Sequence, residues 1–189
     1  MAAPIRIPAL ALAAAIALLA LATALTAPAR ADAAGCRSSH ASPSKLSKHQ
    51  VSRSILCLIN KERASRGLHE VKLQGEQTKA ARRHSRLMIS DGCFAHECPG
   101  EGELVSRMQK ADYLPCNCYW GVGENLAYGE RAYGSPKSIM HAWMNSPEHR
   151  ENILNGSYRD IGIGIVWGTP EQGSARASAT YTTDFGYKH

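Results

Sequence analysis

Three polar side chains in this sequence are of the types, and stand in the settings, that chemistry can use. His96 follows Phe94 in a loop, Glu124 lies among glycines, and His149 stands at the start of a short helical pattern. Two neutral imidazoles can ligate a divalent ion, while a carboxylate can ligate the ion, orient a bound water or deprotonate it. The set predicts weak, zinc-like binding by His96 and His149, with Glu124 as the candidate base.

Each of these side chains also has a purely structural interpretation. His96 could cap its loop, Glu124 could hold its glycine-rich turn by accepting backbone N–H bonds, and His149 could cap its helix. Other catalytic signatures are missing from the sequence: it has no Gly-x-Ser-x-Gly elbow, no phosphate-binding glycine loop and no dinucleotide-binding fingerprint. His96 and Glu97 begin a metalloprotease-like string, but Gly100 occupies the position of the second histidine.

The N-terminus predicts export. Arg6 is the only charge before an apolar run from 7 to 27, and Ala29-Arg30-Ala31 follows as a small-residue cleavage site. The run, of about 20 residues, is also long enough for an uncleaved membrane anchor. We expect a signal peptide at 1–31, a flexible arm at 32–46, rich in Ala, Ser, Gly and Pro, and one domain at 47–189, with no transmembrane helix in the mature chain.

The charge of the chain gives little indication of a nucleic-acid partner. The formal net charge is +6, and losing Arg6 and Arg30 with the signal peptide lowers it to +4. No basic run is interleaved with aromatic residues, so we expect no nucleic-acid partner. A set of basic residues does recur at helical spacing, which favours a solvated helix face: Lys79, Arg82, Arg83 and Arg86.

The cysteines predict disulfides, because an exported chain with an even number of them meets an oxidising environment. Six cysteines allow 15 pairings, and Cys116 and Cys118 are too close in sequence to bridge each other comfortably. We expect Cys93 and Cys98 to pair with these two, and Cys36 to pair with Cys57. The alternative is a zinc site made by the last four cysteines, but neither pair has the two-residue gap of a zinc knuckle. The six are Cys36, Cys57, Cys93, Cys98, Cys116 and Cys118.

The elements that must position these residues are helices first and strands later, which indicates an α+β fold. Apolar spacing predicts helices from about 51 to 66, 75 to 90, around 104 to 108, from 136 to near 147, and from 148 to 154. The segment 121–127 is interpreted as a loop flanking a strand. Two runs, 161–167 and 179–185, predict a hairpin. His84 and His141, on the helices, are expected at the surface or partly buried. Trp143 and Trp167 are expected in the core.

Several strings in this order resemble the CAP superfamily of cysteine-rich secretory proteins, antigen five and pathogenesis-related group one proteins, most of all its bacterial secreted branch. The strings are Phe-Ala-His at 94–96, Gly-Glu-Asn-Leu-Ala at 123–127, Trp-Met-Asn-Ser-Pro-Glu-His-Arg-Glu-Asn-Ile-Leu at 143–154, Ile-Gly-Ile-Gly at 161–164 and Tyr-Thr-Thr-Asp-Phe at 181–185. The resemblance implies a three-layer α-β-α sandwich with a central antiparallel sheet and a cleft lined by two histidines and two glutamates.

Three of those four cleft positions are matched by His96, Glu124 and His149. The family's second acid lies three residues after the tryptophan, where this chain has Ser146, and Glu148 stands near it in sequence. The resemblance therefore implies a secreted, non-enzymatic binding domain whose cleft holds a divalent metal such as zinc and a small or lipid-like ligand. The alternatives are a metal-assisted, peptidase-like hydrolase and a disulfide-stabilised cell-wall interaction protein with a vestigial cleft. We expect an extracellular monomer, free or associated with the cell surface, whose partner is a lipid or a cell-wall component.

Overall fold

Two of the described helices begin at a serine, Ser47 or Ser135, whose side chain accepts a hydrogen bond from the backbone of the first turn. The computed structural model describes residues 36–114, 119–173 and 175–189. The helices are α1 (Lys48–Ala64), α2 (Gly75–Ser90), α3 (Leu104–Lys110), α4 (Pro136–Met144) and α5 (Pro147–Leu154); the strands are β1 (Lys72–Leu73), β2 (Trp120–Glu130), β3 (Asp160–Trp167) and β4 (Ser178–Lys188). None of the described helices has the length and hydropathy needed to cross a membrane.

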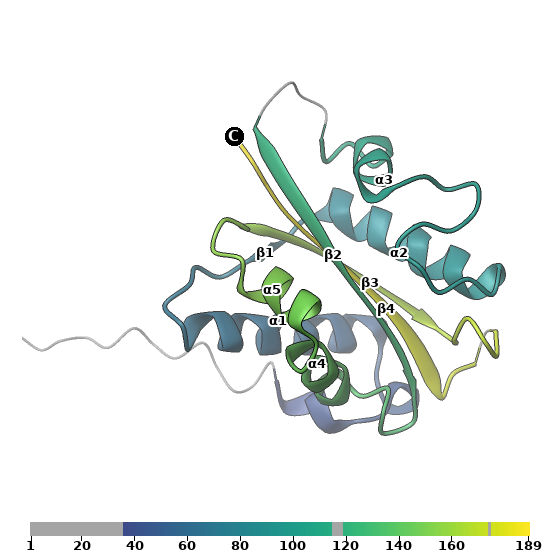
Figure 1. The fold of residues 1–189 in the computed structure, drawn as a ribbon. Helices are drawn as coiled ribbons and strands as arrows, with labels where there is room; N and C mark the ends of the chain where they lie inside the picture. The colour runs from purple at the N-terminus through teal and green to yellow at the C-terminus, as the bar shows by residue number, and fades with distance from the viewer. Residues whose placement is uncertain (1–35, 115–118, 174) are drawn as a thin grey trace, which may run out of the picture. The chain divides into compact units, whose positions relative to one another are not determined.

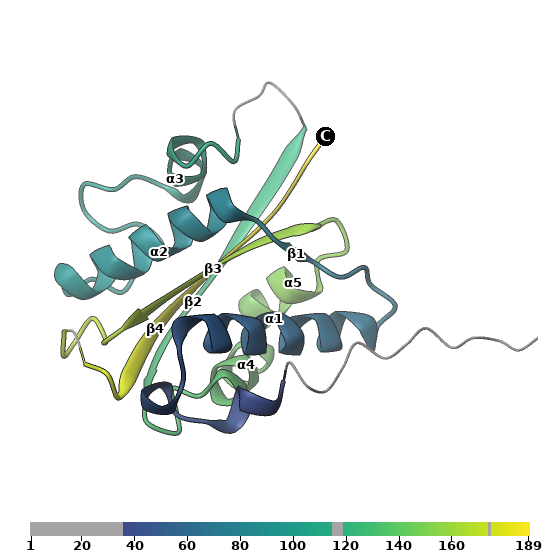
Figure 2. The same ribbon diagram turned by 180° about the vertical axis from the view of Figure 1, so that it is seen from behind.

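One four-stranded sheet lies between two layers of helices. Its strand order is β1-β3-β4-β2, with β3 and β2 antiparallel to the central β4 and the two-residue β1 parallel to β3. Helices α2 and α3 cover one face, and α1, α4 and α5 cover the other (Figures 1 and 2). The α-β-α sandwich and the hairpin of the last two strands are therefore confirmed.

Helix α1 shows how the sequence fixes one layer. Ser47 and Gln50 form a capping box, each side chain bonding to the other's backbone N–H. At the other end of the helix, the fully buried Arg63 donates hydrogen bonds from its guanidinium to four backbone carbonyls. Those carbonyls belong to His69, Ile153, Asn155 and Tyr158. This one cation therefore ties α1 to the end of α5 and to the chain that leads into β3.

Helix α2 packs directly on the backbone of β3. A Cβ added to Gly162 would lie 2.2 Å from the carbonyl carbon of Gln77, and one added to Gly164 would lie 2.3 Å from that of Ala81. Both distances are far below van der Waals contact, so only glycine allows this approach. The Gly-x-Gly spacing of the strand is thus a packing requirement of the helix layer that carries part of the site.

Three expectations about the elements differ from the structure. Residues 121–127 lie within strand β2 and not in a loop, because β2 pairs with β4 over its whole length. The described part of the expected flexible arm, 36–46, forms two 3-10 turns with Pro43 and Leu46 buried. His84, expected near the surface, is fully buried on α2. Trp143 is buried as expected, whereas Trp167 is only partly buried.

The disulfide prediction is half right. Cys36 bonds to Cys57, as expected. Cys93 bonds to Cys98 and not to Cys116 or Cys118, because the loop turns back and brings the two α-carbons to 6.0 Å, within disulfide range. This bond also rules out the four-cysteine zinc site. Cys116, Cys118 and the predicted signal peptide lie outside the described residues.

Candidate functional site

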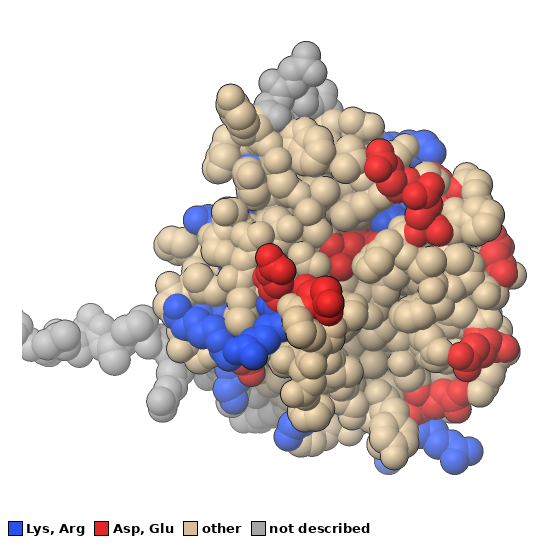
Figure 3. Space-filling view, in the orientation of Figure 1, with Lys and Arg blue, Asp and Glu red and all other residues tan. Residues whose placement is uncertain are grey.

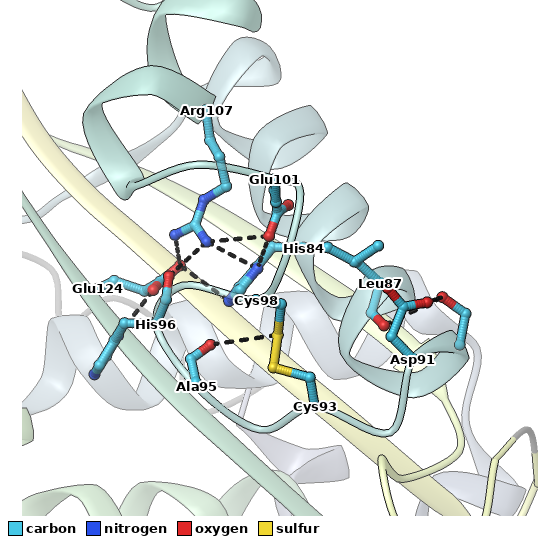
Figure 4. Close-up of a disulfide and its surroundings, with 11 residues drawn as sticks. His84, Leu87, Asp91, Cys93, Ala95, His96, Cys98, Glu101, Arg107 and Glu124 are labelled. Atoms are coloured by element: carbon cyan, nitrogen blue, oxygen red, sulfur yellow. Dashed lines mark hydrogen bonds and ion pairs between the residues drawn. A yellow bond between two sulfur atoms is a disulfide. The ribbon is translucent and has the colours of Figure 1, made fainter.

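A buried network of charged side chains surrounds Glu124, which lies in the middle of β2. Arg107 on α3 donates from Nη2 to Glu124 Oε2 at 2.6 Å, and both side chains are almost completely buried. The other oxygen, Oε1, lies 2.8 Å from Nδ1 of His96. Both carboxylate oxygens of Glu124 are therefore engaged (Figure 4). In the space-filling view of this face, acidic side chains and a cation lie together in a hollow near its middle (Figure 3).

The network extends to the second helix of this layer. Nη1 of Arg107 donates to the backbone carbonyl of His96 at 2.8 Å and lies 2.8 Å from Nδ1 of His84. That ring nitrogen also lies 2.5 Å from Oε2 of Glu101, in the loop before α3. Arg107 is thus the centre of the network, and it fixes both the carboxylate and the loop that carries His96 (Figure 4).

The electrostatics of Glu124 follow from these contacts. Burial would raise the pKa of its carboxyl, but the His96 hydrogen bond and the charge of Arg107 bring the net pKa below its ordinary value. The same hydrogen bond raises the pKa of His96 above 6.5, against a smaller lowering by burial. Glu124 therefore stays ionised at neutral pH, and His96 takes a proton more readily than a free imidazole.

Asp184 lies opposite Glu124 in the register of β4 with β2 and is fully buried. Neither of its carboxylate oxygens has a hydrogen-bond partner among the described residues. Burial, followed by the nearby charge of Glu124, raises the pKa of Asp184 well above its usual range. Because only one of two adjacent buried carboxyls ionises readily, Asp184 is the neutral member of the pair.

His149 belongs to a second, shorter chain of contacts on α5. Its Nδ1 lies 2.7 Å from Oγ of Ser146, and that hydroxyl donates to Oε2 of Glu148 at 3.1 Å. This direction of donation assigns the ring proton to Nδ1 and leaves Nε2 as the acceptor. Partial burial, followed by the charge of His96, lowers the pKa of His149. The acid missing at Ser146 is thus replaced by a hydroxyl, through which the exposed Glu148 reaches His149 only indirectly.

Asn125 and Asn152 join the two groups of residues. Asn125, which is fully buried, donates to the backbone carbonyl of His149 at 2.9 Å. Asn152 donates to the carbonyl of Glu124 at 3.1 Å and to the side-chain oxygen of Asn125 at 2.9 Å. The Gly-Glu-Asn string of β2 therefore holds α5 in place through the side chain of Asn125 and the backbone carbonyl of Glu124. The side chain of Glu124 belongs to the charged network.

A groove of about 880 Å³ lies beside these residues. It falls in the size range of small-molecule sites. Phe94 and Tyr128 meet in its wall edge to face, with ring centroids 4.8 Å apart. The rest of the wall is made largely by β2 and α4, and Ser146 and His149 also line it, with Leu126, Ala127, Ile139, Ala142 and Trp143 among the apolar residues.

The residues present fit a divalent ion only weakly. Among the described residues, no group of three or more His, Cys, Asp or Glu side chains is arranged to hold a metal ion. Glu124 is committed to Arg107 and His96, which leaves two imidazoles as ligands. In both histidines Nδ1 is held by a neighbour, so Nε2 is the nitrogen free to coordinate, an orientation typical of metal-binding histidines.

The sequence interpretation missed Arg107, His84, Glu101 and Asp184. A signal for two of them was present: His84 follows Ala80 and precedes Met88 by four residues, on the apolar side of its helix. Arg107 likewise stands three residues after Leu104 and directly before Met108, on the buried side of α3. No sequence pattern indicated Glu101, and the pairing of Asp184 with Glu124 depends on strand register, which the sequence alone does not give.

Comparison with known proteins assigns the chain to a family. Residues 56–182 match the model of the cysteine-rich secretory protein (CAP) family. The uncharacterized protein YkwD of Bacillus subtilis strain 168 is 33% identical over 140 residues, which are 74% of this chain and 50% of that protein. A second relative from the same strain, the uncharacterized membrane protein YlbC, is 29% identical over 111 residues, 59% of this chain and 30% of that one. The chain thus spans half or less of the length of these curated relatives.

Solved structures show the same fold at lower identity. An extracellular protein containing an SCP domain from Bacillus anthracis strain Ames is 24% identical with a TM-score of 0.57, and the match covers 74% of this chain and 43% of that one. An outer surface protein from Borrelia burgdorferi is 18% identical with a TM-score of 0.62, and the match covers 76% of this chain and 97% of that one. With the family model matched over most of the domain, the chain belongs to the cysteine-rich secretory protein (CAP) family.

Proposed function

We propose that this chain is an extracellular binding domain whose groove takes a small apolar or amphipathic, lipid-like ligand. The observation that carries the proposal is the groove of about 880 Å³, with Phe94, Tyr128 and Trp143 in its wall and His149 at its lining. Aromatic walls bury apolar ligand surface, and a few polar groups fix orientation. Extracellular and outer-surface relatives support a location outside the cell.

Catalysis is less well supported by the residues of the site. A general base works best with a pKa near the operating pH. The pKa of Glu124 is lowered, and both of its oxygens already accept hydrogen bonds. Ser146 stands in place of the acid that would sit beside His149. For these reasons the hydrolase remains the second candidate, tested by hydrolysis of a peptide library with and without a chelator.

A divalent ion is a secondary part of the proposal. His96 and His149 would hold it through Nε2, and when bound it would supply a positive charge for a polar ligand group. Zinc titration by calorimetry at neutral pH should show weak binding that is lost in both His96→Ala and His149→Ala. Unchanged binding in the two variants would refute this site while leaving the apolar groove intact.

Ligand binding in the groove is tested by a substitution that fills the groove with a larger side chain. Ala142 on α4 lines the groove and is exposed, so Ala142→Trp places a bulky ring in it without disturbing the core. The matched control is Ala64→Trp, because Ala64 is an exposed alanine of α1 away from the groove. We expect saturable binding of cis-parinaric acid, weakened at least about tenfold by the first change only.

Two results would contradict the proposal. The first is the absence of saturable binding to the unmodified protein, together with no lipid detected by mass spectrometry after organic extraction of the protein purified in oxidised form. The second is an equal effect of the tryptophan substitutions at 142 and 64, which would show that the probe binds elsewhere.

A further inference from the structure

Basic side chains from three separate segments converge at the edge of the sheet where β3 ends. Arg82 and Arg86 lie on the exposed face of α2, Lys48 begins α1, and Arg176 belongs to the connection between β3 and β4. In Figure 2 the end of β3 lies between the C-terminal half of α2 and the N-terminal end of α1. The convergence is therefore a property of the tertiary fold, in addition to the helical spacing of the basic residues in the sequence.

The ring of Trp167, the last residue of β3, contacts two of these cations. Nζ of Lys48 lies 5.8 Å from the centroid of its ring, and Cζ of Arg176 lies 4.6 Å from it. Both distances fall within the range of cation–π interactions. The guanidinium of Arg176 also donates to the backbone carbonyl of Leu46 at 2.9 Å. Two of the cations are thus held in place by one partly buried ring.

The positive charges at this edge are close enough to repel one another. The pKa of Lys48 is lowered by partial burial and then by the charges of Arg86, Arg82 and Arg176. Within the described residues, none of these four cations forms a salt bridge with an acid. Uncompensated like charges destabilise the compact state, and a bound anion would remove that repulsion.

A solvated helix face or a guarded sheet edge explains part of this arrangement. Charged residues on an edge strand prevent edge-to-edge pairing. That role needs cations beside the strand, but it does not need Lys48 of α1 and Arg176 of the β3–β4 connection to lie against one indole ring near the arginines of α2. The two cations held against Trp167, one of them also bonded to the carbonyl of Leu46, are the feature that neither explanation accounts for.

We propose that this surface, the basic edge (Lys48, Arg82, Arg86, Trp167 and Arg176), binds a linear phosphodiester polymer that carries no bases. Successive cations on α2 are about one helical turn apart, roughly 5–6 Å, which suits a chain with regularly repeated charges. A base-free polymer fits better than a nucleic acid, because single-stranded nucleic acids stack their bases on open aromatic faces. The ring of Trp167 is instead engaged by Lys48 and Arg176.

The test uses the oxidised protein and poly(glycerol phosphate) of defined length, with affinity measured by calorimetry over a range of salt concentrations. Four neutralised phosphates predict a slope of log K against log salt of about −2.8, at roughly 0.7 for each contact of a single strand. Arg82→Gln/Arg86→Gln should weaken binding at least about tenfold and bring the slope to about −1.4. Lys61→Gln/Lys72→Gln removes the same net charge from exposed positions outside the basic edge and should change neither value.

Each other outcome overturns the proposal. Absence of binding at low ionic strength refutes it directly. Equal losses in the two double variants would show a response to net charge alone. Tighter binding of single-stranded DNA with the same number of phosphates would assign the surface to nucleic acid, and tighter binding to vesicles of anionic phospholipid would assign it to a membrane surface.

Discussion

Replacing Arg107 with methionine should destabilise the fold chiefly through Glu124. The two side chains are 4% and 2% exposed and are joined at 2.6 Å, so the change leaves a buried carboxylate without its cation. Breaking a buried ion pair from one side costs about 3–5 kcal/mol. That is a large part of the roughly 5–15 kcal/mol by which domains are typically stable. The loss is measured by urea unfolding at neutral pH with the disulfides intact.

The stability lost in Arg107→Met should depend on pH, because the loss comes from the charge of Glu124. In the natural chain the folded pKa of Glu124 is lowered, so its stabilisation is present above pH 4.5 and is lost as the pH falls through the folded pKa. Without Arg107 burial dominates, and the folded pKa rises above the unfolded one. The deficit of Arg107→Met should therefore shrink on acidification from about pH 7 to about pH 5, as Glu124 takes up a proton.

A double-mutant cycle isolates the pair. In a Glu124→Gln background the buried charge is gone, so Arg107→Met should cost much less than in the natural chain, with a coupling energy of about 2–3 kcal/mol. The reasoning is refuted if Arg107→Met costs the same in both backgrounds, or if its deficit grows as the pH falls.

Three further predictions concern packing, the disulfide and titration. Gly164→Ala should cost about 1–3 kcal/mol in urea unfolding because the new methyl overlaps the backbone of α2; Gly75→Ala, where the site is open, should cost nothing, and equal losses would contradict this account. Cys93→Ser/Cys98→Ser should lower stability by about 2 kcal/mol, as expected for so short a loop, and an unchanged urea midpoint would argue against it. In NMR titrations His96 should have a pKa above 6.5, because its ring is hydrogen-bonded to Glu124. The stability that this contact adds is therefore present below pH 6.5 and is lost as the pH rises through the folded pKa of His96. A titration midpoint below 6.5 would show that the contact does not persist in solution.

The helices were predictable because their signals are local. The capping residue Ser47, the proline at the start of α4 and the apolar spacing of α2 each act within a few residues. Strand β2 was not predictable in this way. Its glycines lower strand propensity, and its extended conformation depends on pairing with β4 from Trp120 to Glu130. That partner lies far along the chain, beyond the reach of a local pattern.

The candidate site also contains residues that local sequence patterns predict and residues that they do not. Its two histidines, His96 and His149, were found from sequence because they stand in recognisable strings. The buried charges around them were not, because a cation such as Arg107 is normally expected at the surface. Only the tertiary arrangement shows that its guanidinium donates to the carboxylate of Glu124 and to the backbone carbonyl of His96. A polar residue on the apolar side of a helix is the signal that would have raised this possibility.

The replacement of an acid by Ser146 has an effect beyond the loss of one carboxylate. A carboxylate bonded to Nδ1 would favour the charged imidazole and raise the pKa of His149, whereas the hydroxyl of Ser146 lets burial lower it. His149 is then neutral at the pH where His96 is still partly protonated, and Glu124 remains an engaged, weakly basic anion. Two rings of unequal basicity beside an apolar groove are suited to orienting a polar ligand group. A general acid and base work best with pKa values near the operating pH, so this arrangement favours the proposed binding role over the hydrolase.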